Sequence, residues 1–208
     1  MIRPLLSLIW IGLVLSGLWG CQSLESRPAA DNNRLTESRN QLRLSQLTQW
    51  QLQGKIGVTQ GNQRDSAAIN YWKQAQEHFE IQVSSTLLGL GATAIYGDPS
   101  YLTIEESGEP PVSSSNPQQL LAQSLGWQLP LSAMPFWIKG LPSPNAPHSW
   151  QHEGNSKNPI LQQSDWVIRY DRLLPLSSSK DAPFLPHKVV MSQGNKEIKI
   201  VISEWMTQ

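Results

Sequence analysis

The chain has 208 residues, with 16 basic and 16 acidic side chains, so its formal net charge is zero. Without a basic excess to neutralise phosphate groups, we expect no nucleic-acid partner. A single cysteine, Cys21, excludes an intrachain disulfide. The length suits one domain with a substantial core.

The N-terminal segment has the pattern of a secretory signal peptide. Arg3 supplies a positive charge, and the uncharged run 5–19 that follows is 15 residues long. This is shorter than the roughly 20 residues that cross a bilayer, so we predict a cleaved signal over residues 1–20. Cys21 then lies directly after the cut, where a lipid acceptor is expected. We predict a bacterial lipoprotein, with an ordinary cleaved signal as the alternative.

Two neighbours of Cys21 refine this prediction. Trp19 is bulky at a position where lipoprotein signals usually carry a small residue. Gln22 stands where lipoproteins retained in the inner membrane usually have Asp, which favours the outer membrane. Residues 21–33 are polar and without an apolar period, which predicts a lipidated N-terminus on a flexible tether. The folded domain is expected over 34–208, beginning with an amphipathic helix over about 34–47.

From Trp50 onward the apolar residues alternate with polar ones, which is typical of half-buried strands. The clearest strands are expected at 50–58, 79–83, 92–96, 101–104, 166–170, 188–191 and 198–202. Turn residues at 60–62, 97–100 and 193–195 separate some of them. Short alternating strands favour an antiparallel sheet curled into a barrel or a sandwich, and disfavour a parallel doubly wound fold.

Two short helices are expected in the middle of the chain. Asn116 can cap a helix that begins at Pro117 and ends at Gly126. Ser132 can cap a second short helix, which Gly140 would end. The proline-rich stretches 142–147 and 173–186 are expected to be irregular.

The sequence nominates no catalytic or metal site. His148 and His152 are four residues apart, but Pro147 and Gly154 flank them, so we interpret them as exposed loop residues. No Gly-x-Ser-x-Gly, Walker or dinucleotide-binding motif is present. We therefore expect no enzyme, no cofactor and no metal. A membrane-anchored hydrolase would require a Ser/His/Asp or metal cluster that the sequence does not offer.

One loop carries a different signal. Leu87 and Leu88 stand between two predicted strands, where a polar hairpin tip is expected. Exposing leucine side chains to water at a loop tip is unfavourable, so we expect them to contact either the protein core or another apolar phase. The first alternative is a loop folded back over the core, and the second is a wedge that touches lipid or a partner.

Several segments, taken in order, resemble the LolB family of outer-membrane lipoprotein receptors, and the similarity runs from about Leu35 to Trp205. The most specific segment is Trp-Ile-Lys-Gly-Leu-Pro at 137–142, with Leu-Pro-Leu upstream at 129–131. The others lie at 50–58, 72–74, 88–89, 166–170 and 200–205. This chain departs from the family at Leu87, where proline is usual, and at Trp19.

The resemblance implies a fold and a function. The fold is a mainly β (α+β), single-domain, half-open antiparallel β-barrel of about eleven strands, with a few helices covering an apolar cavity. Such a protein accepts lipoproteins from the periplasmic carrier LolA and inserts them into the inner leaflet of the outer membrane. We expect a monomer that is lipid-anchored in the outer membrane and faces the periplasm. The leucine that the family needs for delivery corresponds to Leu88.

Strand phase nominates seven candidates for the lining of an acyl-chain cavity. These are Trp50, Ile56, Trp72, Ile81, Trp137, Ile168 and Ile200. The alternative function is a structural or assembly lipoprotein that holds a protein partner on its sheet, and its mark would be a filled core without a cavity.

Overall fold

The computed structural model describes residues 32–85, 91–144, 146–152 and 158–207. The predicted signal peptide, Cys21 and the two loop leucines Leu87 and Leu88 lie outside these ranges. Within the same ranges, no helix is both long enough and apolar enough to span a membrane.

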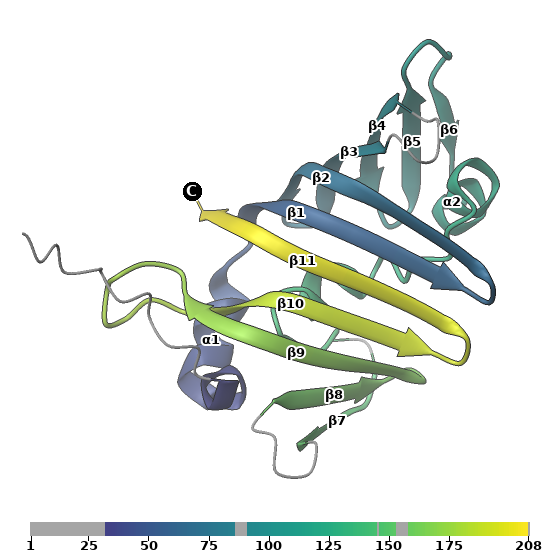
Figure 1. Ribbon diagram of the computed structural model, residues 1–208. Coiled ribbons are helices and arrows are strands. Elements are labelled where there is room, and N and C mark those ends of the chain that lie inside the picture. The colour runs from purple at the N-terminus through teal and green to yellow at the C-terminus, as the bar shows by residue number, and fades with distance from the viewer. Residues whose placement is uncertain (1–31, 86–90, 145, 153–157, 208) are drawn as a thin grey trace, which may run out of the picture.

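Four short helices and eleven strands make up the described chain (Figure 1). The helices are the 3₁₀-helix η1 (Asn32–Thr36), α1 (Ser38–Gln46), α2 (Pro117–Leu125) and α3 (Met134–Trp137). The first six strands are β1 (Gln49–Gln60), β2 (Gln63–Ala75), β3 (His78–Ser85), β4 (Gly91–Asp98), β5 (Tyr101–Glu106) and β6 (Val112–Ser114). The remaining five are β7 (His148–His152), β8 (Pro159–Gln163), β9 (Trp166–Pro175), β10 (Phe184–Gln193) and β11 (Lys196–Thr207).

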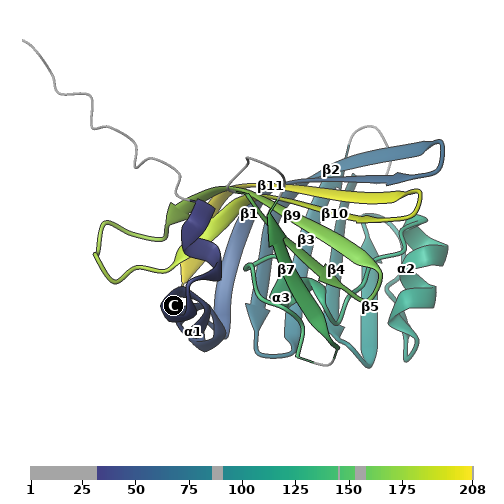
Figure 2. The same ribbon diagram turned by 90° about the horizontal axis from the view of Figure 1, so that it is seen from below.

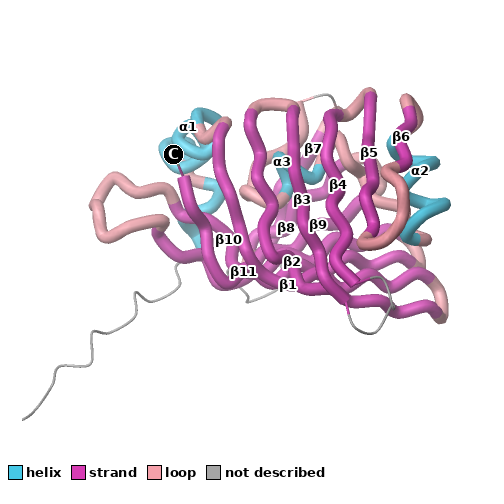
Figure 3. Tube along the Cα trace, turned by 90° about the horizontal axis from the view of Figure 1, so that it is seen from above, coloured by secondary structure: helices cyan, strands magenta, loops and turns pink. Residues whose placement is uncertain are grey.

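All eleven strands belong to one antiparallel sheet in the order β6-β5-β4-β3-β2-β1-β11-β10-β9-β8-β7. The chain runs outward from β1 to β6, passes through α2 and α3, and returns from β7 to β11 beside β1. The sheet curls so that its two ends face one another with α3 between them, and β6 and β7 remain unjoined edges (Figures 2 and 3). This confirms the predicted half-open barrel.

Alternation along the strands decides which side chains enter the interior. On β1, Leu52, Ile56 and Val58 are buried while Lys55 is exposed. The strand register shifts at Gly54, which lies so close to β11 that an added Cβ would be 2.2 Å from the carbonyl oxygen of Val201. Glycine is therefore required where β11 carries its extra residue and approaches β1 most closely.

Helix α2 agrees with the prediction from the sequence, whereas helix α3 begins differently. Asn116 accepts a hydrogen bond from the Gln119 amide, Pro117 begins α2 and Gly126 ends it, as predicted. Helix α3 begins at Met134 and Ala133 precedes it, so the prediction of a Ser132 cap was wrong. The reason is that the Pro130 carbonyl already accepts from the amides of Ala133 and Met134, so a backbone turn organises this helix start.

Sheet pairing also overrides two predictions of irregular structure. Strands β9 and β10 extend into the proline-rich stretch 173–186, where Phe184 pairs with Pro175. His148 and His152 lie on the edge strand β7 rather than in a loop, although both are exposed as expected. Edge strands tolerate polar and proline-flanked sequence, which explains why alternation did not reveal β7.

Candidate functional site

An apolar cavity lies between the sheet and the segment that crosses its interior. Strands β1 to β4 form one wall, and the segment 127–135, which follows α2 and includes the first two residues of α3, forms the other. The wall residues are Ile56, Ile69, Trp72, Phe79, Ile81, Val83, Ile95, Trp127, Leu129, Leu131, Met134 and Pro135. No charged side chain is among them, so the lining suits hydrocarbon.

This cavity is nearly filled by its own walls. Its volume is about 30 Å³, which is close to the space of a single water molecule. Sites that enclose small ligands usually measure roughly 300–1,000 Å³. Segment 127–135 therefore fills most of the space between itself and the sheet, and we call this arrangement the closed form.

Three of the seven predicted lining residues surround this cavity. Ile56 on β1, Trp72 on β2 and Ile81 on β3 all contribute to its wall. Cross-strand pairing brings two of them side by side, because Trp72 and Ile81 are partners in the β2–β3 ladder. The Trp72 Nε1 donates to Gln74 Oε1 at 3.2 Å, so its one polar group is satisfied.

Trp50 lies elsewhere, in an aromatic row at the end of the barrel. Its ring centroid is 5.5 Å from that of Trp72 and 5.3 Å from that of Trp205. Trp205 is fixed in turn by its Nε1, which donates to the Pro186 carbonyl at 2.9 Å. Tilted and edge-on contacts of this kind stabilise aromatic clusters beyond their burial, so Trp50 is a packing residue between β2 and β11.

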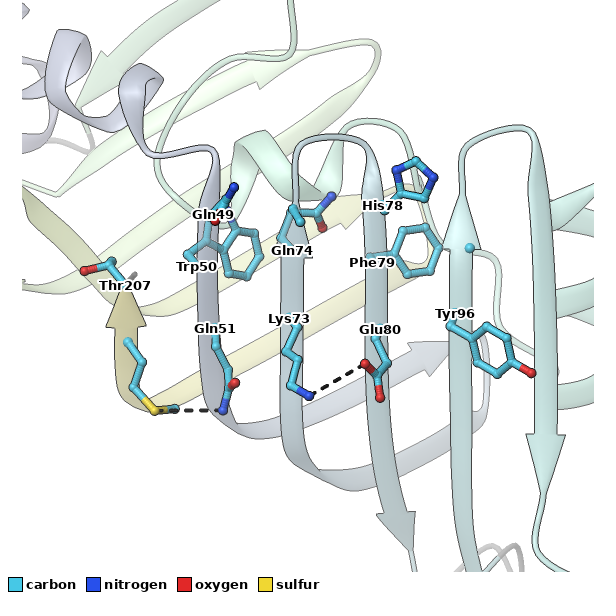
Figure 4. Close-up of a pocket in the computed structure, with 13 residues that line it drawn as sticks. Gln49, Trp50, Gln51, Lys73, Gln74, His78, Phe79, Glu80, Tyr96 and Thr207 are labelled. Atoms are coloured by element: carbon cyan, nitrogen blue, oxygen red, sulfur yellow. Dashed lines mark hydrogen bonds and ion pairs between the residues drawn. The ribbon is translucent and has the colours of Figure 1, made fainter.

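Trp50 also borders an open groove of about 920 Å³. The groove lies at the end of the sheet where β2 turns into β3, and Figure 4 shows its lining. Gln51, Lys73, Glu80 and Tyr96 form a row across β1 to β4. This lining mixes charged, polar and apolar side chains, whereas the interior cavity is lined by apolar residues and two tryptophans.

The charged centre of that row is a small network. Lys73 Nζ lies 3.6 Å from Glu80 Oε2, and the Tyr71 hydroxyl donates to Glu80 Oε1 at 2.6 Å. This hydrogen bond to the carboxylate raises the pKa of Tyr71 above its ordinary value. The Lys73–Glu80 pair is half exposed, so it organises the surface more than it stabilises the fold.

Trp137, the fifth predicted lining residue, belongs to a packed region centred on Gln163. Its Nε1 donates to Gln163 Oε1 at 2.7 Å, and the Ser143 amide donates to the same oxygen at 2.8 Å. Gln163 Nε2 donates to the carbonyls of Ser143 and Ala146, both at 2.7 Å. Four hydrogen bonds thus attach α3 and the following loop to β8.

Lys139 is a second residue of the Trp-Ile-Lys-Gly-Leu-Pro segment with a structural role. It is buried, and its Nζ donates to the carbonyls of Leu44 and Leu47 at the C-terminal end of α1, at 3.3 and 2.7 Å. Burial lowers the pKa of Lys139 to about 8. Gly140 follows at φ +86°, and a Cβ there would lie 2.3 Å from Leu35. The segment therefore holds α1 and η1 against α3.

Ile168 and Ile200, the last two candidates, are fully buried in the β9–β11 half of the sheet. Ile168 pairs with Met191, and Ile200 pairs with both Ile56 and Val189. Ile200 lies beside the wall residue Ile56, whereas Ile168 lies on β9, three strands from β1, and neither borders the cavity in this closed form.

The candidates chosen from strand alternation omitted several residues of the cavity wall. Phe79, Val83 and Ile95 share the strand alternation that identified Ile81, so the same pattern contained them. Trp127 and Leu129 lie in a segment without periodic structure, and no local signal shows that it enters the barrel. Leu87 and Leu88 are outside the described residues, but their loop joins β3 to β4, which both contribute to the wall.

The described residues offer no alternative metal centre. Among them, no three His, Cys, Asp or Glu side chains lie close enough together to hold an ion. His148 and His152 remain on the exposed face of an edge strand.

Comparison with known proteins agrees with this architecture. A LolA superfamily protein from Nitrosomonas europaea superposes with a TM-score of 0.50 at 11% identity, covering 86% of this chain and 94% of that chain. This likeness concerns the fold alone.

Sequence relatives are closer. The outer-membrane lipoprotein LolB of Marinobacter nauticus is 32% identical over the whole of both chains. That of Chromohalobacter salexigens is 31% identical over 95% of this chain and 89% of its own. The family model described as outer membrane lipoprotein LolB matches residues 48–205. The chain therefore belongs to the LolB family, as its sequence motifs predicted.

Proposed function

We propose that this protein accepts lipoproteins from the periplasmic carrier LolA, holds their acyl chains inside its half-barrel, and inserts them into the inner leaflet of the outer membrane. Membership of the LolB family makes it an outer-membrane lipoprotein with a role in lipoprotein localisation. The observation that carries the finer proposal is the uncharged wall formed by β1 to β4 and the segment 127–135.

Hydration energetics explain why such a wall is needed. Each buried CH₂ group contributes roughly 0.8 kcal/mol, so three acyl chains with about 45 such groups represent on the order of 36 kcal/mol. Transfer of the chains through water is therefore too unfavourable to occur. An apolar interior supports direct transfer, in which affinity increases from carrier to receptor to membrane and no nucleotide is consumed.

Cargo entry requires the closed cavity to expand. The interior segment 127–135 contributes no strand to the sheet, whereas the opposite wall is held by continuous ladders. Displacing this segment exposes the concave face without breaking strand pairing. We therefore propose that segment 127–135 moves while the sheet stays intact.

Leu87 and Leu88 are proposed to act at release. Their loop joins two wall strands, so apolar side chains there would bring the membrane close to the cavity. Leu88→Glu should leave folding and cargo uptake intact and lower membrane incorporation at least tenfold, because a carboxylate resists entry into hydrocarbon. Leu88→Ile is the matched control, and equal incorporation by the Leu88→Glu protein would end the wedge role.

Cys21 is proposed to determine where delivery ends. A full-length Cys21→Ala protein, exported by an ordinary signal, should accept cargo at an unchanged rate and deliver it to membranes less efficiently. Mass spectrometry of the wild-type N-terminus tests the modification itself. Failure of the Cys21→Ala protein to accept cargo would make the anchor part of the binding machinery.

The decisive experiment mixes the Cys21→Ala protein with LolA carrying a radiolabelled lipoprotein and follows the label by pull-down. We expect the label to leave LolA and stay with this protein until outer-membrane vesicles are added. Retention by LolA would refute the receptor role and favour the alternative, a structural lipoprotein that binds a protein partner. We propose a monomer that acts without catalysis, cofactor or nucleic acid.

A further inference from the structure

Trp127 differs from its neighbouring tryptophans in one respect. It follows α2, forms part of the cavity wall and is 3% exposed. Among the described tryptophans, it alone has an indole nitrogen that is both buried and without a hydrogen-bond partner. Trp72 in the same wall donates to Gln74, and Trp137 donates to Gln163.

An unpaired buried donor destabilises the protein. Leaving an N–H group without a partner costs about 1–3 kcal/mol, and folded proteins rarely retain one without a reason. A phenylalanine would fill much of the same space without this cost. A residue of the cavity wall therefore carries a buried donor that is unpaired in the closed form.

A second unpaired polar group lies on β4, on the sheet side of the cavity, although it does not border the void itself. The Thr93 hydroxyl is buried and has no partner among the described residues. Thr93 pairs directly with Val83 and shares a strand face with Ile95, and both of these residues line the cavity. Two hydrogen-bonding groups thus belong to an interior that is otherwise hydrocarbon.

The surroundings select the chemistry of the acceptor. The cavity wall contains no Lys, Arg or His, so a phosphate or carboxylate would enter without a counter-charge. A neutral carbonyl requires only one good donor. In an acylated lipoprotein, such carbonyls occur where each chain begins, in ester and amide bonds.

We propose that the Trp127 indole N–H donates a hydrogen bond to the ester or amide carbonyl of a bound acyl chain and so fixes how deeply the chain enters. The Thr93 hydroxyl is a further donor on the sheet side of the cavity. This inference rests on the proposed acyl-binding function and assigns its polar contact. Burial of the hydrocarbon chain provides the affinity, and the hydrogen bond from Trp127 fixes the depth at which the chain binds.

The test compares two lipids that differ in the carbonyl. Monopalmitoylglycerol has an ester, whereas 1-O-hexadecylglycerol has an ether in its place. Each competes with the hydrocarbon dye diphenylhexatriene for the full-length Cys21→Ala protein. We expect the wild-type cavity to prefer the ester about fivefold, which is within the usual range for one hydrogen bond. Trp127→Phe should reduce this preference to about one, whatever its effect on dye affinity, because the ester and the ether are compared within the same protein.

Trp72→Phe is the matched control, because it removes an indole N–H that is already paired in the same wall. It should keep the ester preference. An unchanged preference in Trp127→Phe, or none in the wild type, would overturn the inference and leave acyl binding in place. Failure of dye and both lipids to bind any of the proteins would instead remove the proposed function as well.

A second measurement needs no variant for its result. In the wild-type protein, the Trp127 indole ¹H–¹⁵N resonance should move downfield when the ester binds and much less when the ether binds. Trp127→Phe is used only to assign that resonance. Equal shifts with the two lipids would contradict a hydrogen bond to the carbonyl.

Discussion

The two halves of the curled sheet differ in how completely side chains fill their interiors. In the β7–β11 half, Ile168 and Ile200 are fully buried, and Gln163 makes four hydrogen bonds within the core. In the β1–β5 half, a small void remains, Ile81 is only partly buried, and Thr93 has no partner. The β1–β5 half thus retains unused space, whereas the β7–β11 half is filled, although the buried Tyr170 hydroxyl on β9 also has no partner among the described residues.

We infer that the β7–β11 half supports the fold and that the β1–β5 half contains the proposed binding site. The packed half also holds α1, because Lys139 binds the end of that helix and Asn40 exchanges two hydrogen bonds with the backbone of Phe184. In the cavity half, the residues of β1 to β4 and of segment 127–135 that border the void are all apolar. Expansion is therefore expected in the β1–β5 half, while the β7–β11 half stays unchanged.

Removing Gln163 should have the largest effect. Gln163→Leu leaves the Trp137 and Ser143 donors and two backbone carbonyls unpaired, so we expect the free energy of unfolding to fall by about 4 kcal/mol. Urea denaturation measures this loss. Gln162→Leu is the control on the same strand, since the Gln162 side chain meets only the exposed Gln151. Equal losses would mean that the Gln163 network does not support the packed half.

A matched pair of isoleucines compares the two halves directly. Ile168→Ala should cost about 3 kcal/mol, because the dense packing cannot collapse around the missing atoms. Ile81→Ala should cost only about 1 kcal/mol, since its side chain already borders a void, and should raise dye uptake. Denaturation and dye titration of both proteins provide the readouts. A larger loss at Ile81 would reverse the proposed division of the molecule.

The fold was largely predictable because strand alternation and turn residues are local signals. Trp50, Ile56 and Ile81 were correctly assigned to strands, and the Asn116–Gly126 helix was confirmed with its cap. Strands β2, β6, β7 and β8 were not among the expected strands, and β9 and β10 extend beyond theirs, because their sequences lack the clear alternation that marked the others. Ladder pairing, rather than local propensity, forms these elements.

The site was less predictable for a related reason. Periodicity shows that Ile168 and Ile200 face inward, but it does not show which part of the interior the segment 127–135 leaves empty. Trp137 and Lys139 stood out in the sequence as part of a motif, yet they attach helices to the packed half. Trp127 had no distinguishing pattern, and only its unpaired nitrogen identifies it.

The smallest expected effect concerns pH and Lys139, which joins the packed half to α1. Burial lowers its pKa from the ordinary 10.5 to about 8 in the folded protein. Between these values the unfolded chain binds more protons than the folded one, so the free energy of unfolding rises with pH.

Relative to Lys139→Met, which cannot titrate, wild-type stability should increase by about 1 kcal/mol between pH 7 and pH 9. Urea denaturation of both proteins at the two pH values measures the difference. The two carbonyls that accept from Nζ favour the charged amine and reduce this gain. A stability difference independent of pH would mean that these carbonyls fully offset the burial of the charge, so that Lys139 stays protonated and the end of α1 is held by an ammonium group throughout this range.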